Sequence, residues 1–285
     1  MPSDDPLSYR RRAIGTALQR FRAERRLTQE RAARLLDRSA ASLSAYENGV
    51  RAIRPRDLAH ILDAYGITDE ALRRRLLYLA AQGRRDGWWH GYEERVGMFM
   101  IEHVALEADA SRIRTFEPTV VHGLLQTPEY ARAVISGATI EECSQRDLES
   151  GIEFRMNRQR ILSGDSPPLY QVVLGEGALR LRMGSEEVVR GQYRKLLAAC
   201  DVPHIELQIL PFEVGAYPGL EGRFTLFDVG VEETLRVVST YSMIRNWYVD
   251  DPLEVDHYAR THDRLREMSL TPERSRDWLE QRVSS

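Results

Sequence analysis

Residues 27–49, LTQERAARLLDRSAASLSAYENG, contain two short helical patterns that meet at residues 37–38. Thr28 can cap the first helix and Ser39 the second, because a hydroxyl oxygen accepts a hydrogen bond from a free N–H of the first helical turn. Gly49 supplies the left-handed residue that commonly ends a helix. Two helices joined by so tight a turn, inside a small helical cluster, predict a helix-turn-helix.

The helical pattern continues on both sides of this stretch. Ile14, Leu18 and Phe21 recur at spacings of three to four, which places them on one face of a preceding helix. Pro55 can open a following helix at its first position. No strand pattern interrupts residues 9–65, so we expect an all-helical module. The apolar face of its second helix is predicted to be Ala32, Ala33, Leu35 and Leu36.

The formal net charge of -3 hides an uneven distribution of charge along the chain. Residues 1–85 contain 18 arginines and 10 acidic residues, a net charge of +8, whereas the remaining 200 residues carry -11. A basic module joined to an acidic body is typical of nucleic-acid binding confined to one domain. A charged helical face that is merely solvated is the alternative.

The N-terminal segment resembles the Xre/Cro-type helix-turn-helix regulators over residues 9–67. Those proteins share a Thr-Gln start to the second helix, an alanine in its middle and a Ser-x-x-Glu-x-Gly close to the third. The resemblance implies that Gln29 contacts DNA, that residues 39–45 lie in the major groove, and that the arginines after them lie near phosphates. The candidate DNA-binding residues are Thr28, Gln29, Arg38, Ser39, Ala40, Ala41, Ser42, Ser44, Ala45, Arg51, Arg54 and Arg56.

The sequence departs from this family in the part that would read bases. The family usually has glycine and an apolar residue at positions 37–38, here Asp37 and Arg38, and often glutamine or arginine at positions 40, 41 and 45, here alanine. Bidentate hydrogen bonds to bases need long polar side chains. We therefore expect few direct base contacts, with part of the sequence specificity coming from DNA shape. A helix-turn-helix retained mainly for protein contacts is the alternative.

Beyond residue 92, helical stretches alternate with short β-rich runs, which predicts a mixed domain around one sheet. The expected fold class is α+β, an all-α helix-turn-helix domain of lambda-repressor-like type followed by a larger mixed α/β domain. We predict a DNA-binding domain at residues 1–83, a linker at 84–92, and an effector-sensing or dimerisation domain at 93–285. The expected strands are residues 111–118, 169–175, 204–211, 222–229 and 235–241, and the expected helices are 98–110, 127–135, 147–162, 185–200 and one starting at 271.

The second part resembles the effector-like domain that actinobacterial Xre-type regulators carry behind their helix-turn-helix, from about residue 93 to 280. The similarity lies in VVHGLLQTPEYARAVI, FRMNRQRIL and the stretch that begins VVLGEGALRLRMG. His122 stands where the family usually has proline. The resemblance implies a bacterial transcription regulator whose second domain senses a ligand or a small partner protein, and it brings no established chemistry.

The predicted helix at 147–162 places two polar residues, Arg155 and Gln159, on its otherwise apolar face. A buried arginine needs a partner. We predict Glu176 for that role, with Arg180 one helical turn later. Such a cluster is either a structural polar network or a pocket for an anionic ligand or peptide carboxylate. The candidate ligand-binding residues are His122, Gln126, Arg155, Gln159, Glu176 and Arg180.

The sequence indicates no catalytic residue, metal site or cofactor. The Gly-x-Gly of LGEGALR lacks the third glycine of a dinucleotide fingerprint. His257 and His262 lack the spacing of a zinc-binding helix. Cys143 and Cys200 are far apart in the sequence and lack the paired spacing of a zinc site.

We therefore expect a cytoplasmic, sequence-specific transcription regulator that is not an enzyme and that binds double-stranded DNA as a homodimer. No apolar run is long enough to span a membrane. A small-molecule effector or a small partner protein would act on the second domain. The alternatives are an antitoxin-like interaction module with degenerate DNA reading and, further off, an enzyme that works through the C-terminal domain.

Overall fold

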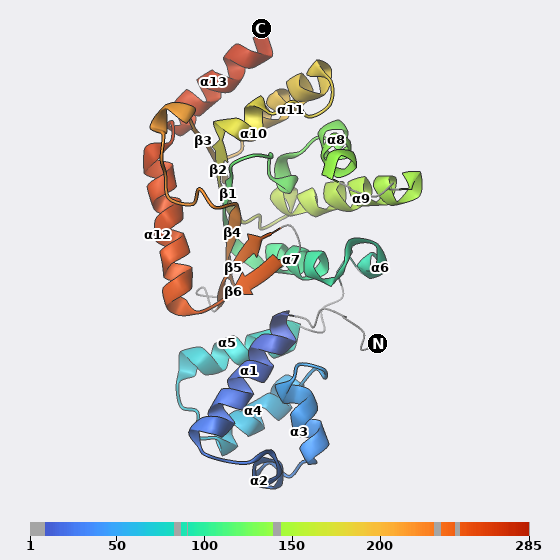
Figure 1. Ribbon diagram of the computed structural model, residues 1–285, viewed down its shortest axis with the longest axis vertical. Coiled ribbons are helices and arrows are strands. Elements are labelled where there is room, and N and C mark those ends of the chain that lie inside the picture. Colours follow the sequence, from blue (N-terminus) through green and yellow to red (C-terminus); the bar gives the residue numbers. More distant parts are fainter. Residues whose placement is uncertain are drawn as a thin grey trace. The chain divides into compact units, whose positions relative to one another are not determined.

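The computed structural model describes residues 9–82, 87–89, 91–138, 144–230, 235–242 and 246–284 (Figure 1). The described residues up to Glu102, with Gly230, form one compact unit, and those from His103 to Val229 and from Leu235 onward form a second. The first unit is helical and the second contains a six-stranded sheet, so the predicted α+β class is confirmed. Of the predicted linker, residues 84–86 and 90 lie outside the described residues.

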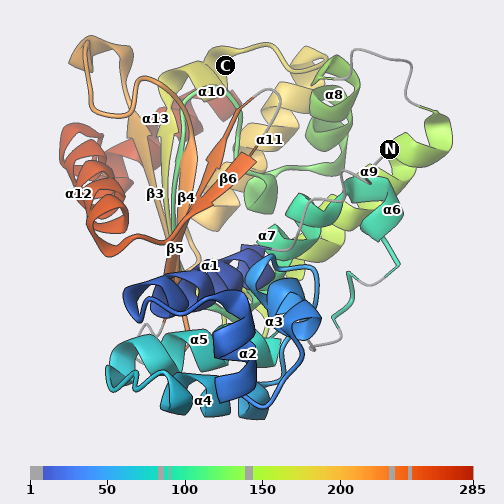
Figure 2. The same ribbon diagram turned by 60° about the horizontal axis from the view of Figure 1, so that its bottom comes forward.

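The first unit packs α1 to α5 around one apolar core (Figure 2). The prediction that Ile14, Leu18 and Phe21 share one apolar face of α1 is confirmed, since all three are buried. In α2 the buried face is narrower than predicted: Leu36 is 1% exposed but Leu35 is 53% exposed. The helices are α1 (Tyr9–Glu24), α2 (Gln29–Leu35), α3 (Ala40–Glu47), α4 (Pro55–Ala64), α5 (Glu70–Gln82), α6 (Glu93–Val96) and α7 (Met98–Asp109), the last of which runs across the division between the units.

A close approach of α1 to α3 depends on Gly15. A Cβ at this position would lie 2.4 Å from the carbonyl oxygen of Glu47, which is backbone and cannot move aside. The helix-turn-helix is therefore seated directly on α1.

The second unit is built on a mixed sheet in the order β3-β2-β1-β4-β5-β6. The three strands β1, β2 and β3 are parallel, whereas β4 pairs antiparallel with β1 and continues as an antiparallel meander through β5 and β6. The strands are β1 (Ala110–Glu117), β2 (Leu169–Gly175), β3 (Ile205–Leu210), β4 (Phe224–Val229), β5 (Leu235–Tyr241) and β6 (Asn246–Val249).

Helices cover both faces of this sheet. Figure 1 shows α12 along one face and α7, α8 and α9 on the other. Phe116, Phe224 and Leu226 point toward α12 and form a core with its Val255 and Leu265. The remaining elements are α8 (Pro128–Ala138), α9 (Gln145–Arg158), α10 (Glu176–Arg180), α11 (Glu186–Ala199), α12 (Pro252–Met268) and α13 (Pro272–Ser284), with the 3-10 turns η1 (Gly123–Leu125), η2 (Gln159–Ser163) and η3 (Phe212–Val214).

Two differences from the sequence-based expectation concern element limits. The helix expected at residues 147–162 is α-helical only to Arg158 and continues as the 3-10 turn η2. Strand β6 was not predicted, although its Trp247, Tyr248 and Val249 are residues that favour strands.

Candidate nucleic-acid interface

The helix-turn-helix begins both of its helices with a side-chain cap, as predicted. The Thr28 hydroxyl accepts from the N–H of Arg31 at 3.3 Å, and the Ser39 hydroxyl accepts from the N–H of Ser42 at 3.1 Å. Each cap satisfies one donor of the first helical turn. The start of α3, the predicted recognition helix, is therefore fixed.

The turn between α2 and α3 has the hydrogen bonds of a Schellman motif. The backbone N–H of Asp37 donates to the carbonyl of Arg34 at 3.2 Å, and the backbone N–H of Arg38 donates to the carbonyl of Ala33 at 2.9 Å. Asp37 occupies the left-handed position, with φ of 51°, where glycine is usual. Aspartate tolerates this conformation better than most residues, so the tight turn forms without a glycine.

A buried ion pair connects α1, α2 and α3. The Arg22 guanidinium donates to both carboxylate oxygens of Glu47, at 2.7 and 3.0 Å, and the Gln29 amide donates to the same carboxylate at 3.0 Å. The Glu47 side chain is 1% exposed, and its bond to Arg22 raises the pKa of that guanidinium. Sequence reasoning missed this pair; the signal was Glu47, the only acid in α3, next to the buried Tyr46.

These bonds change the role expected of two predicted DNA contacts. The Gln29 side-chain nitrogen is engaged by Glu47. Arg38 donates to the Asp57 carboxylate at 2.8 Å and lies 5.9 Å from the centroid of the Tyr46 ring. In this conformation both side chains make contacts that hold the motif together.

The remaining predicted contacts of α3 are short side chains on its outer side. Ser39 and Ala41 are exposed, whereas Ala40, Ser42, Ser44 and Ala45 are partly exposed. The Ser44 hydroxyl accepts from the Asn48 amide at 3.2 Å. The surface that would enter a groove therefore offers methyl and hydroxyl groups, which can contact thymine methyls and hydrogen-bond either base.

Three exposed arginines follow α3. Arg51 lies with its guanidinium 5.8 Å from the Tyr46 ring centroid, and Arg54 and Arg56 flank the first position of α4. Among the described residues none of the three has an acidic partner at ion-pair distance. Their charge is available to phosphate groups.

The candidate ligand-binding residues of the second unit fall into three places. Gln126, Arg155 and Gln159 lie together: Arg155 donates to the Gln126 side-chain oxygen at 2.6 Å, and the Gln159 amide donates to the Gln126 backbone carbonyl at 2.8 Å. Lys195 donates to the same carbonyl at 2.8 Å. Burial lowers the pKa of Arg155 to about 10, with the positive charge of Arg158 adding to the effect.

The prediction that Glu176 pairs with Arg155 is wrong. Glu176 accepts instead from Arg180 at 2.6 Å, one turn further along α10, and from the N–H of Phe212 at 2.9 Å. Residues four apart on a helix are neighbours, so the nearer arginine takes the carboxylate.

His122 lies in a different buried cluster. Its Nδ1 is 2.7 Å from the Tyr170 hydroxyl. Nearby, Arg158 donates to both carboxylate oxygens of Glu107 at 2.6 Å, and His103 lies 3.3 Å from that carboxylate. Sequence reasoning missed Arg158, which is 5% exposed, because it assigned the buried face of α9 to residue 155 instead.

This cluster contains three potential metal ligands. His103, Glu107 and His122 place one potential ligand atom each within 4.8 Å of one another. The Arg158 guanidinium, however, already holds both oxygens of the carboxylate and lies 3.2 Å from His103. A metal ion would face this second cation, so the residues fit an internal ion pair better than a metal site.

Two buried carboxyl groups of this region have opposite electrostatic environments. Burial opposes ionisation of Glu107, but Arg158 outweighs it and lowers the pKa to about 2. Burial raises the pKa of Glu117 to about 7, because the opposing charge of Arg223, 3.9 Å from its carboxylate, offsets the burial only in part. The two carboxyl groups therefore differ in charge state near neutral pH, because only Glu107 has a guanidinium in direct contact with both oxygens.

Family comparison agrees with this geometry. The family model described as Helix-turn-helix domain matches residues 13–76. The helical unit therefore contains a helix-turn-helix domain, which is typical of DNA-binding regulators. The chain belongs to the family described as Domain of unknown function (DUF5753), whose model matches residues 100–281. No curated protein and no solved structure matches the chain. Within the described ranges, no helix combines the length and apolar character needed to cross a membrane.

Proposed function

We propose that this protein is an Xre-type transcriptional regulator that binds double-stranded DNA as a homodimer in the cytoplasm. The observation that carries the proposal is the α2-turn-α3 motif, whose two helices are both capped and which Arg22 and Glu47 join to α1, in the part of the chain that carries +8. Two copies would contact half-sites about 34 Å apart or a multiple of that distance.

In this proposal phosphate contacts supply most of the affinity, and base contacts supply little. Arg51, Arg54 and Arg56 are exposed and lack acidic partners among the described residues, whereas α3 presents short side chains. Specificity would then come from methyl contacts and from DNA shape.

The second unit would sense a ligand or a small partner protein, without catalysing a reaction. An effector changes DNA binding only if it has different affinities for two arrangements of the protein. An antitoxin-like interaction module is the second candidate function. The observation that favours it is the engagement of Gln29 and Arg38 within the motif, which leaves few side chains to choose a sequence.

The three arginines provide the test. Changing Arg51, Arg54 and Arg56 together to alanine should weaken DNA binding, and the slope of log K against log salt should become shallower by about 2 to 3. Fluorescence anisotropy of a labelled duplex at several salt concentrations measures both quantities.

The matched control removes the same charge elsewhere, through Arg20→Ala, Arg74→Ala and Arg160→Ala. These arginines are exposed on α1, α5 and η2. An equal loss of affinity in both triple variants would show that only net charge matters and would contradict the assigned interface.

A further inference from the structure

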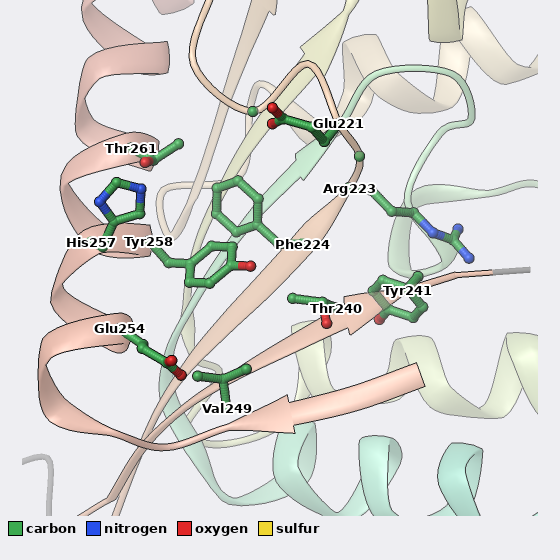
Figure 3. Close-up of a pocket in the computed structure, with 12 residues that line it drawn as sticks. Glu221, Arg223, Phe224, Thr240, Tyr241, Val249, Glu254, His257, Tyr258 and Thr261 are labelled. Carbon is green, nitrogen blue, oxygen red and sulfur yellow. The ribbon is translucent and has the colours of Figure 1, made fainter. Parts of the chain in front are cut away.

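The second unit has a pocket of about 490 Å³ that none of the predicted ligand-binding residues lines. It opens between α12, the adjoining ends of β4 and β5, and the segment of residues 219–223 (Figure 3). Pockets for small organic molecules commonly have volumes of about 300–1,000 Å³, so this one could hold such a ligand.

The wall of the pocket is aromatic. Phe224 of β4 and Tyr258 of α12 lie with ring centroids 5.1 Å apart, and Figure 3 shows the Tyr258 side chain reaching from α12 toward the strands. Phe224 is 2% exposed and packs in the core beneath α12, so it supports the partly exposed ring of Tyr258, which is the aromatic surface that a ligand would meet. Fixed aromatic surfaces favour the apolar body of a ligand, and their faces attract cations.

Two carboxylates of the pocket have no cation of their own. Glu221 and Glu254 are exposed, and no described residue forms an ion pair with either side chain. Figure 3 shows them toward opposite ends of the pocket. Burial, followed by the charges of Glu254 and then Glu221, raises the pKa of Tyr258, so both carboxylates act on the space around its hydroxyl group.

The one arginine that lines the pocket is used elsewhere. The Arg223 guanidinium lies 4.2 Å from the centroid of the Tyr241 ring and 3.9 Å from the Glu117 carboxylate. Figure 3 shows this guanidinium directed away from Phe224 and Tyr258, so its charge lies off the aromatic wall, toward whose two ends the carboxylates stand.

We propose that this pocket binds a small organic ammonium ion, with its apolar body against Tyr258 and its positive charge at Glu254, Glu221 or both. An anionic ligand would meet two uncompensated carboxylates. The inference deepens the proposed function, on which it rests, by assigning to the effector a chemical class and a site.

Calorimetric titration of the full-length protein with tryptamine and indole-3-propionate tests the proposal. The two compounds share one apolar body and differ in the sign of the terminal charge. Tryptamine should bind and indole-3-propionate should not. Glu254→Gln, Glu221→Gln or the double variant should weaken tryptamine binding about tenfold, the usual scale for a charge-assisted contact.

The matched control is Glu187→Gln, an exposed carboxylate on α11 away from the pocket lining, which should leave binding unchanged. The proposal is overturned if the anion binds as well as the amine, or if the pocket variants, including the double one, behave like Glu187→Gln. Failure of tryptamine, cyclohexylmethylamine and spermidine alike to bind would also overturn it.

Duplex binding by the same samples separates this proposal from the proposed function. If the protein binds DNA but no amine, the proposed ligand of the pocket is rejected and the proposed DNA-binding function stands. Amine binding at this pocket by a wild-type protein that does not bind DNA rejects the proposed function and keeps the pocket.

Discussion

At the scale of single residues, buried charges organise both units. In the first unit, Glu47 accepts three hydrogen bonds from Arg22 and Gln29 and thereby joins three helices. In the second, Arg158 and Glu107 form a fully buried pair. Breaking such a pair leaves one unpaired buried charge, so these residues specify how their helices meet.

Glu117 differs from these carboxylates because its burial is poorly compensated and its pKa is raised to about 7. Between about pH 4.5 and 7 the folded chain keeps a proton on Glu117 that the unfolded chain has lost. The contribution of this residue to the free energy of unfolding therefore falls as the pH rises, by up to about 3 kcal/mol.

Glu117→Gln should remove that dependence, because the amide is neutral at every pH. Relative to wild type, the variant should gain about 2 to 3 kcal/mol in the free energy of unfolding between about pH 5 and pH 8. Urea unfolding followed by circular dichroism at both pH values measures the difference. Glu187→Gln serves as the exposed control, and parallel pH profiles for wild type and Glu117→Gln would contradict the prediction.

Residue-scale sequence reasoning succeeded for the helix caps, which depend on local chemistry. It failed to predict which side chains hydrogen-bond to one another. A helical stripe placed Arg155 on the buried face of α9, although Arg155 is only partly buried and Arg158 is the buried arginine. Whether Gln126, Glu176 or another group meets Arg155 depends on how α9 packs against a distant loop. The pocket at Phe224 and Tyr258 was missed for the same reason, since its walls come from separate strands and a helix.

At the scale of elements, the spacing of apolar residues and the positions of helix-capping residues predicted most of the helices. They also predicted five of the six strands of the sheet. The exact ends and the pairing were not predictable. At the 3-10 end of α9, Gln159 donates to the Gly123 carbonyl, and Lys195 donates to the Gln126 carbonyl of the same segment, which is far away in the sequence. Likewise, no local pattern shows that β1 lies between β2 and β4.

The turn between α2 and α3 yields a prediction at this scale. Asp37→Gly should stabilise the motif by about 0.5 to 1 kcal/mol, because φ of 51° is strained for a residue with a Cβ. Hydrogen exchange of the α2 and α3 amides in the full-length chain should slow accordingly. Asp37→Ala removes the same charge but keeps the strain, so equal protection in the two variants would refute this explanation.

At the scale of the whole molecule, a basic helix-turn-helix segment and an acidic family domain share one chain. Residues 1–85 carry +8 and the remainder -11, so attraction to DNA belongs to the first part. Composition alone predicted where the positive charge of the chain lies. It could not reveal the pocket beside α12, whose lining residues come from separate elements.

The central claim is that the chain is a dimeric, sequence-selective DNA-binding regulator. Its most direct test is the selection of random duplex DNA by the purified full-length protein at near-physiological salt, followed by sequencing. We predict enrichment of a palindromic motif with half-sites about one helical turn, or a multiple of it, apart. DNA binding that leaves the pool without enrichment would contradict the claim and favour the interaction-module alternative.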